Sequence, residues 1–536
     1  MKKFFRNIVF KIPFLRRAGE KAALQLRGYA GAKVNRFTAD WLTDYSTINR
    51  QIKNDVKAVR GRARDMWKNN PLIRAYRKRL LSDVIGPDGF KLQMRVEKAD
   101  GTPDQKANDM IEQAWAEWMK KEHCTMSGTL TFTQVLWLLI EQYKRDGEFI
   151  CRKVLADKEQ NKFGFSLELI EPDLLDETYN DFKGENAIIM GIEFNQWKKP
   201  INYYFKEYDL NHEMTGVFAY TGHNSGNWNK VSADQIVHIF DPEHSNQFRG
   251  MSHLAPIMLE MRQLNGYDEA AVLAARLGAS KNIFIKRDKD TELQGEETNE
   301  RGDVVQYVSY GEAHYLNPGE SLDSWNPTYP NAEYADFVKA IQRRLAVALG
   351  MSYNAWLSDL EGVNFSSMRS GLLTERDQWL IDQGFIIETF LEPIFSAWLK
   401  MALMTGAINL PYGDYERLNH PEFLGRRWQW VDPYKDVQAS ATAIENNLTT
   451  VTRELKKQGI DFDDFVVERK RELEMLTEAG ISTVASIKHP DYVGDGGDEE
   501  VEDNEVANDN KSDRMMKEIM AVLKKHGNGH FKQLVK

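Results

Sequence analysis

Cysteine and long apolar runs are the two features that this 536-residue sequence has least of. Its two cysteines, Cys124 and Cys151, stand outside any C-x-x-C or zinc-type spacing, so we expect ordinary thiols in a chain made for a reducing compartment. No stretch approaches the roughly 20 apolar residues that cross a bilayer, which predicts no membrane-spanning helix. Lys11 and Pro13 interrupt the apolar run within Met1–Leu15, so this segment is not predicted to be a secretory signal.

The sequence also lacks the short motifs of several enzyme classes. It contains no G-x-x-x-x-G-K-[ST] phosphate loop, which argues against a P-loop motor ATPase, and neither G-x-S-x-G nor H-E-x-x-H. His238, His244 and His253 are too unevenly spaced to favour a metal site. The acidic run Gly494–Glu500 fits a solvated linker better than a calcium loop. We therefore predict no catalytic residue, no metal ligand and no cofactor.

The net charge of -10 is distributed unevenly along the chain. Residues 1–36 hold ten Lys or Arg against one acid, and residues 50–79 hold eleven against two. Residues 491–505 hold eight Asp or Glu and no base. This asymmetry favours a polyanionic or acidic partner near the N-terminus and a solvated acidic tail near the C-terminus. In Arg62–Arg79, however, interleaved apolar residues favour two amphipathic helices with solvated outer faces over a dedicated nucleic-acid site.

Apolar periodicity predicts helices on both sides of a β-rich region. Helices are expected at 50–65, 71–85, 105–121 and 132–145, with a strand at 90–96. From Glu148 to Phe240, short β-like runs separated by turn residues predict a mostly antiparallel, meandering sheet. The expected strands are 148–155, 165–170, 188–195, 201–210 and 235–240. Because a chain of this length exceeds one compact core, we predict a multidomain α+β fold.

Two further helices enclose the polar stretch 283–330, which includes the strand-like run 304–310. The helix expected at 253–280 is rich in alanine, including Ala270, Ala271, Ala274 and Ala275. Small residues let helices approach closely, which suits a ring of packed neighbours, although an ordinary helix packed within its own domain is equally consistent with the pattern. The helix expected at 333–349 carries Lys339, Arg343 and Arg344 opposite its apolar face.

A helix break at Gly350 is the most informative local feature. Glycine tolerates the left-handed conformation that ends a helix, and a polar loop is expected before a helix resumes near Ser370. Beyond it we expect a long helix at 371–403 that Pro393 kinks or divides, then a short strand at 428–431. A helical block is expected from 432 to about 479, interrupted at Gly459, and a last short helix at 512–526.

Two distant segments carry a family resemblance. The N-F-S-S-x-R run at Asn364–Arg369 is similar to the segment that follows the stem in double-stranded DNA phage portal proteins of the lambda family. The run RARDMWKNNPLIRAYRKRLLSDVIGPDG at Arg62–Gly89 resembles the N-terminal signature of the same family. The resemblance covers about residues 40–480.

The resemblance implies a portal fold, with an α+β wing, a long-helix stem, a small α/β clip and a helical crown. Mapped onto this sequence it implies a basic arm at 1–49, wing at 50–252, stem helix at 253–282, clip at 283–330, second stem helix at 331–350, tunnel loop at 351–371, long helix and wing return at 372–435, crown at 436–485, and an acidic, disordered tail at 486–536.

The resemblance further implies a non-enzymatic ring, typically of twelve subunits, at one capsid vertex in the virion, assembled in the host cytoplasm. Double-stranded DNA would be packaged and later ejected through it without sequence preference. Implied partners are the terminase large subunit, capsid and scaffold proteins, and a head-completion or adaptor protein, with no membrane. The implied channel residues are Asn364, Phe365, Ser366, Ser367 and Arg369 in the loop, with Lys339, Arg343 and Arg344 facing the channel from the stem.

Two other classes of protein remain open from the residues alone. A metal-dependent nucleic-acid-processing enzyme would need clustered acids to bind Mg²⁺, and Glu168, Glu171 and Asp173 are the nearest such group. A stand-alone DNA-binding protein would use the basic arm and show a steep dependence on salt.

Overall fold

The computed structural model describes residues 46–155, 161–206, 228–279, 283–287, 320–324, 333–359, 361–428 and 433–478. The chain forms two compact units, residues 1–462 and 463–536, and nearly all the described elements belong to the first. The basic arm up to residue 45, the run at 304–310, and the tail with its expected last helix lie outside the described residues.

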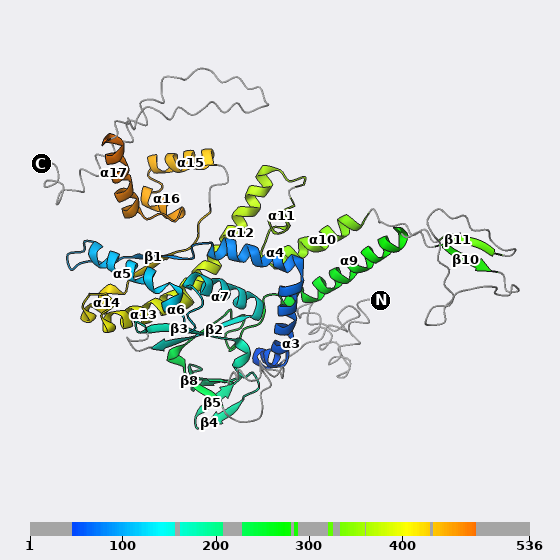
Figure 1. The fold of residues 1–536 in the computed structure, drawn as a ribbon, viewed down its shortest axis with the longest axis horizontal. Helices are drawn as coiled ribbons and strands as arrows, with labels where there is room; N and C mark the ends of the chain where they lie inside the picture. The colour runs from blue at the N-terminus through cyan, green and yellow to red at the C-terminus, as the bar shows by residue number, and fades with distance from the viewer. Residues whose placement is uncertain are drawn as a thin grey trace, which may run out of the picture. The chain divides into compact units, whose positions relative to one another are not determined.

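Helices and one π-helical turn make up the N-terminal part of the first unit (Figure 1). They are α3 (Ile48–Asn69), α4 (Pro71–Arg79), the π turn η2 (Leu80–Ile85), α5 (Gln105–Trp118), α6 (Lys121–Cys124) and α7 (Phe132–Asp146). Asn70 separates the first two, because its side chain accepts hydrogen bonds from the backbone N–H groups of Leu72 and Ile73 and so caps α4. The first helix therefore continues to this cap rather than ending at residue 65.

Two antiparallel sheets follow, as the alternating runs predict. A three-stranded sheet has the order β3-β2-β9, and a five-stranded meander runs β4-β5-β6-β7-β8. The strands are β2 (Glu148–Leu155), β3 (Phe165–Ile170), β4 (Asp181–Lys183), β5 (Asn186–Ile189), β6 (Ile192–Phe194), β7 (Pro200–Phe205), β8 (Asn229–Ser232) and β9 (Ile236–Phe240), with 3₁₀ turns η3 (Pro172–Leu174) and η4 (Ala233–Gln235). The run at 188–195, expected as one strand, is a hairpin because Met190 (φ 48°) and Gly191 (φ 81°) are left-handed.

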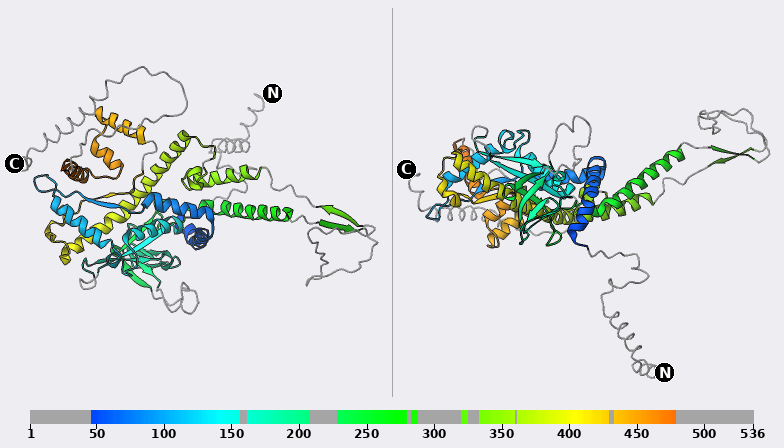
Figure 2. Two further views of the ribbon diagram at one scale, coloured as in Figure 1. Left: turned by 45° about the horizontal axis from the view of Figure 1, so that its top comes forward. Right: turned by 90° about the horizontal axis from the view of Figure 1, so that it is seen from below.

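Two helices farther along the chain run side by side (Figures 1 and 2). After a 3₁₀ turn η5 (Ala255–Ile257), α9 spans Met258–Ala279, and α10 spans Tyr334–Ala348. The Tyr267 ring stacks on Tyr334 near the start of α10, whereas Glu260, near the start of α9, pairs with Arg344 near the end of α10. The two helices are therefore antiparallel. Between them in sequence, β10 (Ile283–Arg287) pairs antiparallel with β11 (Glu320–Ser324).

The remaining elements return to the core and then leave it. They are α11 (Tyr353–Leu357), α12 (Phe365–Ile386), the π segment η6 (Ile387–Leu391), α13 (Glu392–Thr405), η7 (Tyr412–Asp414), α14 (Tyr415–Leu418), β12 (Pro421–Leu424), α15 (Pro433–Glu445), α16 (Val451–Lys457) and α17 (Phe462–Glu478). Pro393 divides the long helix as expected: the π segment immediately precedes α13, in whose first turn the proline lies.

A two-stranded sheet precedes the segment where a strand is expected at 428–431. Its strand β12 (Pro421–Leu424) pairs antiparallel with β1 (Lys91–Met94), and the sequence analysis did not predict it. Trp428 packs its ring on Trp379 of α12, and residues 429–431 lie outside the described part. The strand at 428–431 therefore stays a prediction.

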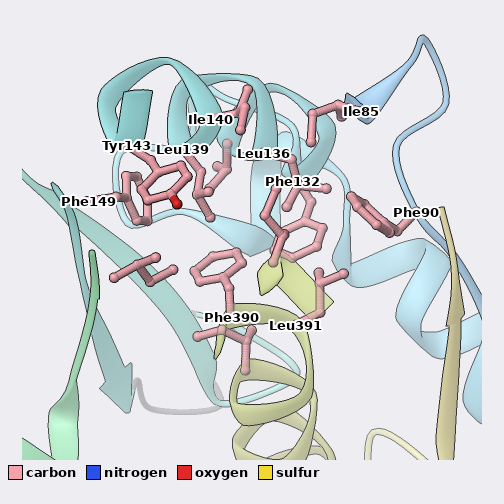
Figure 3. Close-up of a cluster of buried hydrophobic side chains, with 14 of the residues drawn as sticks. Ile85, Phe90, Phe132, Leu136, Leu139, Ile140, Tyr143, Phe149, Phe390 and Leu391 are labelled. Atoms are coloured by element: carbon pink, nitrogen blue, oxygen red, sulfur yellow. The ribbon is translucent and has the colours of Figure 1, made fainter. Parts of the chain in front are cut away.

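Aromatic side chains fill the main core, between α7, β2 and the long C-terminal helices. Phe132 of α7 stacks on Phe390 of the π segment with ring centroids 6.1 Å apart, and Phe149 of β2 meets Phe390 edge-on at 5.7 Å. Figure 3 shows the Phe132, Phe149 and Phe390 side chains pointing toward one another from different elements. Segments separated by more than 200 residues thus share one core.

A buried charge cluster connects the helices to both sheets. Glu148, at the start of β2, is inaccessible to solvent and contacts Arg60 of α3 at 2.7 Å, His238 of β9 at 3.0 Å, and Arg249. Arg249 also donates to the carbonyls of Leu175, just after η3, and of Met190, in the turn between β5 and β6 of the five-stranded sheet. Burial alone would raise the pKa of Glu148, but the two arginines and His238 hold it well below its usual range.

A backbone contact lies beside this cluster. Gly147 (φ 86°) precedes Glu148, and Gly250 follows Arg249. A Cβ atom on Gly250 would lie 1.9 Å from the Gly147 carbonyl oxygen, and one on Gly147 would lie 2.3 Å from the carbonyl carbon of Met251. Only glycine at both positions lets the two segments approach this closely.

Replacing Glu148 by glutamine is expected to lower the free energy of unfolding by about 3–5 kcal/mol, because it leaves two buried arginines without their shared carboxylate. Chemical denaturation at pH 7 measures this loss. The depressed pKa gives stability that is present above the unfolded-state pKa of about 4.3 and lost as the pH falls toward the folded-state value. The difference between the two proteins should therefore narrow below about pH 4.3.

Glu168→Gln is the matched control on the neighbouring strand. The Glu168 side chain is 46% exposed and contacts Arg152 at 3.3 Å, so its loss should change the free energy of unfolding by no more than about 1 kcal/mol. Equal effects of the two substitutions would show that the buried cluster does not stabilise the fold.

Candidate functional site

The candidate site is the junction where α10 ends and the chain passes through α11 to α12. Leu345 and Ala346 are buried at the end of α10, and Gly350 then adopts φ 70°. Met351 N–H donates to the Ala346 carbonyl at 2.9 Å, which satisfies a carbonyl at the helix end. The chain thereby turns away from the axis of α10.

The segment after Gly350 contains less loop than the sequence indicates. A short helix, α11, begins after its Ser352 cap, and α12 begins at Phe365 rather than near Ser370. The reason is Asn364, whose side chain accepts from Ser367 N–H at 2.7 Å and caps α12. The N-F-S-S-x-R run is thus a cap and the first helical turn. Asn364 and Ser367 are exposed, and the side chains of Phe365 and Ser366 lie outside the described part.

Asp359 organises the exposed side of this junction. It accepts from Lys339 at 2.9 Å, from the Tyr353 hydroxyl at 3.0 Å and from Glu361 N–H at 3.1 Å. The Lys339 hydrogen bond is the largest influence on the Asp359 carboxyl and lowers its pKa. Arg343 lies over the Tyr353 ring at 5.6 Å, a cation–π contact.

The three basic stem residues named from the sequence all have partners within the chain. Lys339 pairs with Asp359, Arg343 stacks on Tyr353, and Arg344, although largely exposed, pairs with Glu260 of α9. Acids therefore balance the charges of Lys339 and Arg344, whereas Arg343 keeps its positive charge against a neutral ring.

Arg369 also has an intramolecular partner. It donates to Asp436 of α15 at 2.5 Å, with both side chains partly exposed. This contact joins the first turn of α12 to the helical segment that follows residue 432. Whether Arg369 also contacts DNA stays a prediction.

Beneath the junction, Glu375 of α12 accepts from Ser352 N–H at 2.7 Å. Its second oxygen lies 3.9 Å from Arg79, which is 3.2 Å from Asp83 of the π turn η2. Burial raises the pKa of Glu375, and the nearby Asp83 carboxyl raises it further. The buried Trp356 of α11 donates to the Leu72 carbonyl at 3.0 Å. The junction is thus attached to α4, η2 and α12 together.

The alanines of α9 differ in exposure. Ala271 is buried, Ala274 is half-buried, and Ala270 and Ala275 are exposed. Val272 and Leu273, between them, are 58% and 56% exposed. Because Tyr334 at the start of α10 bonds to Asp268, this part of α9 extends past the first turn of α10. No described element of the chain covers its outer face.

The acids considered as a metal site do not converge. Asp173 lies 2.8 Å from Arg60 and also pairs with Arg64, while Glu168 pairs with Arg152. Burial lowers the pKa of His253 to about 3, and His238 contacts Glu148. Within the ranges that the structure describes, no three His, Cys, Asp or Glu side chains are grouped to hold a metal ion. None of the described helices is long and apolar enough to cross a membrane.

Sequence reasoning missed the partners of the junction. Glu375, Arg79 and Asp83 lie on three elements, and nothing in their local sequence distinguishes them from surface charges. The Asn364 cap had a signal, because Asn followed by a helix-compatible run is a standard helix start. Reading it would have placed the start of α12 correctly.

Comparison with known proteins places the chain in a family. A model described as phage portal protein, lambda family, matches residues 35–383. A probable portal protein of Halomonas phage phiHAP-1 is 31% identical over 467 residues, covering 85% of this chain and 88% of that protein. Portal protein B of Escherichia phage lambda is 21% identical over 489 residues, covering 83% and 89%. The chain belongs to the lambda family of phage portal proteins, whose members serve in the capsid and in DNA packaging.

Two solved structures are more distant. A chain from the neck of an empty gene transfer agent particle is 12% identical, with a TM-score of 0.42 and coverage of 76% of this chain and 94% of that one. An HK97-family phage portal protein from Corynebacterium diphtheriae is 11% identical, with a TM-score of 0.28 and coverage of 69% and 94%. With scores this low, the family assignment depends on the sequence matches.

Glu375→Ala is expected to accelerate amide hydrogen exchange at Ser352, because a partly buried N–H loses its acceptor at a cost of about 1–3 kcal/mol. Glu375→Gln retains an acceptor oxygen and should keep most of the protection. Exchange measured by mass spectrometry over residues 345–360 compares the two variants. Unchanged exchange in the alanine variant would mean that Glu375 does not hold the junction.

Arg369 and Asp436 are expected to show a coupling free energy of about 0.5–1 kcal/mol in a double-mutant cycle of Arg369→Ala and Asp436→Ala, measured from the free energies of unfolding. If the two changes in the free energy of unfolding are strictly additive, Arg369 and Asp436 do not form a stabilising ion pair. Packaging assays on the same variants assign its role: if Asp436→Ala packages DNA normally and Arg369→Ala does not, Arg369 acts on DNA rather than on α15.

Proposed function

We propose that this portal protein assembles as a closed ring of twelve subunits, the number typical of the family, and forms a conduit at one capsid vertex for double-stranded DNA. The ring performs no chemistry. A separate terminase motor docks on it during packaging, and head-completion or adaptor proteins replace the motor before the genome leaves. Capsid and scaffold proteins hold the ring at its vertex in the virion, after assembly in the host cytoplasm.

The exposed apolar surface of the antiparallel helix pair is the observation that carries this proposal. Val272 and Leu273 of α9 project beyond α10, and Leu259 of α9 and Val347 of α10 are 69% and 77% exposed. These four exposed apolar side chains lie toward the two ends of the helix pair, and we propose that neighbouring copies cover them. In a ring the same two surfaces of each copy meet head to tail, which needs a heterologous, closing interface. The small residues Ala270 and Ala275 allow neighbouring helices to approach closely.

The charge arrangement of the junction supports a passage role. Each Lys or Arg contact with a phosphate adds affinity that does not depend on sequence, so a strongly basic lumen would retain DNA and slow its passage. Here Lys339, Arg344 and Arg369 are each paired with an acid. We propose that Asn364 and Ser367, both exposed and uncharged, face the channel with the loop between α11 and α12.

The rest of the predicted division follows from the same proposal. Residues 50–252 with 372–435 form the wing, 253–282 and 331–350 the stem, 283–330 the clip that faces the motor, and 436–485 the crown. Within the proposed tunnel loop, 351–371, the residues from Phe365 onward lie in α12.

Leu273→Glu is expected to abolish the ring while leaving the subunit folded. A charge on an exposed helix face changes subunit stability by no more than about 0.5 kcal/mol, but it would be buried against the neighbouring copy. Native mass spectrometry with negative-stain imaging should show a ring near twelve copies of the 61.9 kDa chain for the wild type and subunits for the variant. Scaffold is included if the isolated wild-type chain does not close.

Phe182→Glu is the matched control. Phe182 is 82% exposed on β4, at an edge of the five-stranded sheet, and the substitution should leave the ring intact. An intact ring in Leu273→Glu would place the subunit interface elsewhere, and a wild-type chain that stays monomeric even with scaffold would contradict the proposed assembly.

A further inference from the structure

The eleven bases of residues 50–79 divide into two groups. Four are paired with acids: Arg60 with Glu148, Arg64 with Asp146, Arg77 with Glu141, and Arg79 with Asp83. The other seven are exposed and form no ion pair within the described part of the chain; they are Arg50, Lys53, Lys57, Arg62, Lys68, Arg74 and Lys78. The four paired bases stabilise the fold through their ion pairs. The seven unpaired bases make no contact with the described residues that assigns them a structural role.

Four unpaired bases lie on one side of α3. Arg50, Lys53, Lys57 and Lys68, here called the α3 row, are separated by three, four and eleven residues, intervals that return to the same side of a helix. Paired Arg64 lies between Lys57 and Lys68 on this side and is only partly buried. From Arg50 to Lys68 the row extends about 27 Å, at about 1.5 Å per residue.

Gly61, which has no side chain, lies in the middle of this row. It lies four residues after Lys57, is exposed, and has nothing within 4 Å of the position that a Cβ would occupy. Glycine in a helix interior is unfavourable, and no packing partner here requires it. Its effect is to leave the helix backbone open to a broad partner at the centre of the row.

A second, shorter row continues the basic surface on the next helix. Arg74 and Lys78 of α4 are four residues apart and both exposed. Figures 1 and 2 show that α3 and α4 meet at an angle, so the two rows run in different directions. Asp55 and Asp65 are the acids on the two helices, in a chain whose net charge is -10.

We propose that the α3 row is a binding surface for the sugar-phosphate backbone of double-stranded DNA; its location outside the channel rests on the proposed function, in which α3 belongs to the wing of the ring. A phosphate backbone needs positive charge at intervals along a straight line and no shaped pocket, and four point charges on a straight helix supply this. Lysine predominates in the row, and its ammonium group binds phosphate without the planar, two-bond geometry of arginine, so the contact does not read sequence. A row of about 27 Å faces about eight base pairs, at about 3.4 Å each.

Closed circular duplex DNA tests this surface separately from the conduit, because a closed circle cannot be threaded through a ring. The assembled wild-type protein should bind relaxed circular plasmid with an affinity that falls as salt rises. Lys53→Gln, Lys57→Gln and Lys68→Gln together should lower the slope of log K against log [salt] by about 2–3, at about 0.9 per lost phosphate contact. At about 0.1 M salt the affinity should fall at least tenfold.

Two matched variants complete the experiment. Lys106→Gln, Lys120→Gln and Lys400→Gln remove three exposed lysines that form no ion pair among the described residues, and circular DNA binding should be unchanged. Lys53→Arg, Lys57→Arg and Lys68→Arg together retain the positive charge and should retain the affinity for circular DNA. Equal loss in both glutamine sets would mean that only total charge matters, which would overturn the proposal.

Three other results would also overturn it. If the glutamine variant of the row binds circular DNA as tightly as the wild type does, the row does not contact DNA. Failure of that variant to form a ring would assign the row to the interface between copies. No binding of circular DNA, combined with binding of a peptide of residues 491–505 that the variant loses, would assign the row to the acidic segment of the chain itself. None of these results bears on whether linear DNA passes through the ring.

Discussion

The buried pairing of Glu148 with Arg249 is the interaction on which the arrangement of the elements depends. The two residues are 101 positions apart, and the arginine reaches the edge of the five-stranded sheet while the carboxylate reaches α3 and β9. A buried ion with a missing partner is costly. Helix α3, the two sheets and the segment leading to α9 therefore assemble in one arrangement, which satisfies all of these charges at once.

Charge in this protein has two separate uses. Between α3 and the two sheets, arginines buried with acids fix the packing of distant segments. At the junction after α10, Lys339, Arg344 and Arg369 are each paired with an acid. On α3 and α4, seven exposed bases form no ion pair with the described residues. A net charge of -10 for the whole chain therefore conceals local differences in charge that are large enough to attract or to release a polyanion.

The sequence predicts elements better than it predicts contacts. Strands β2 and β3 were expected with their observed bounds, because alternating side chains between turn residues report a half-buried strand directly. The hairpin at Met190 was missed, since a left-handed methionine has no local signal and is stabilised by Arg249 from 59 positions away. Likewise β12 was not predicted, because this four-residue strand depends on pairing with β1 across more than 320 residues.

The glycine break and the family resemblance located the candidate site from the sequence. They did not predict the side-chain contacts that hold it in place. The side chains that attach it to the core, Glu375 and Trp356, contact partners on α4 and near the end of α10, which only the folded chain brings together. The start of α12 was expected late because the sequence was read as continuous loop, although Asn364 is a helix cap by residue type.

The close contact of Gly147 with Gly250 has a mechanical consequence for α9. Because these two backbones touch and Leu254, Ile257 and Met261 are buried, the base of α9 has no room to slide against the start of β2. The 22-residue helix is about 33 Å long, at about 1.5 Å per residue. A tilt of about 5° at its base displaces the far end by about 3 Å by simple leverage. Helix α9 is therefore held at its base, and a small change of tilt there produces a larger displacement at its far end.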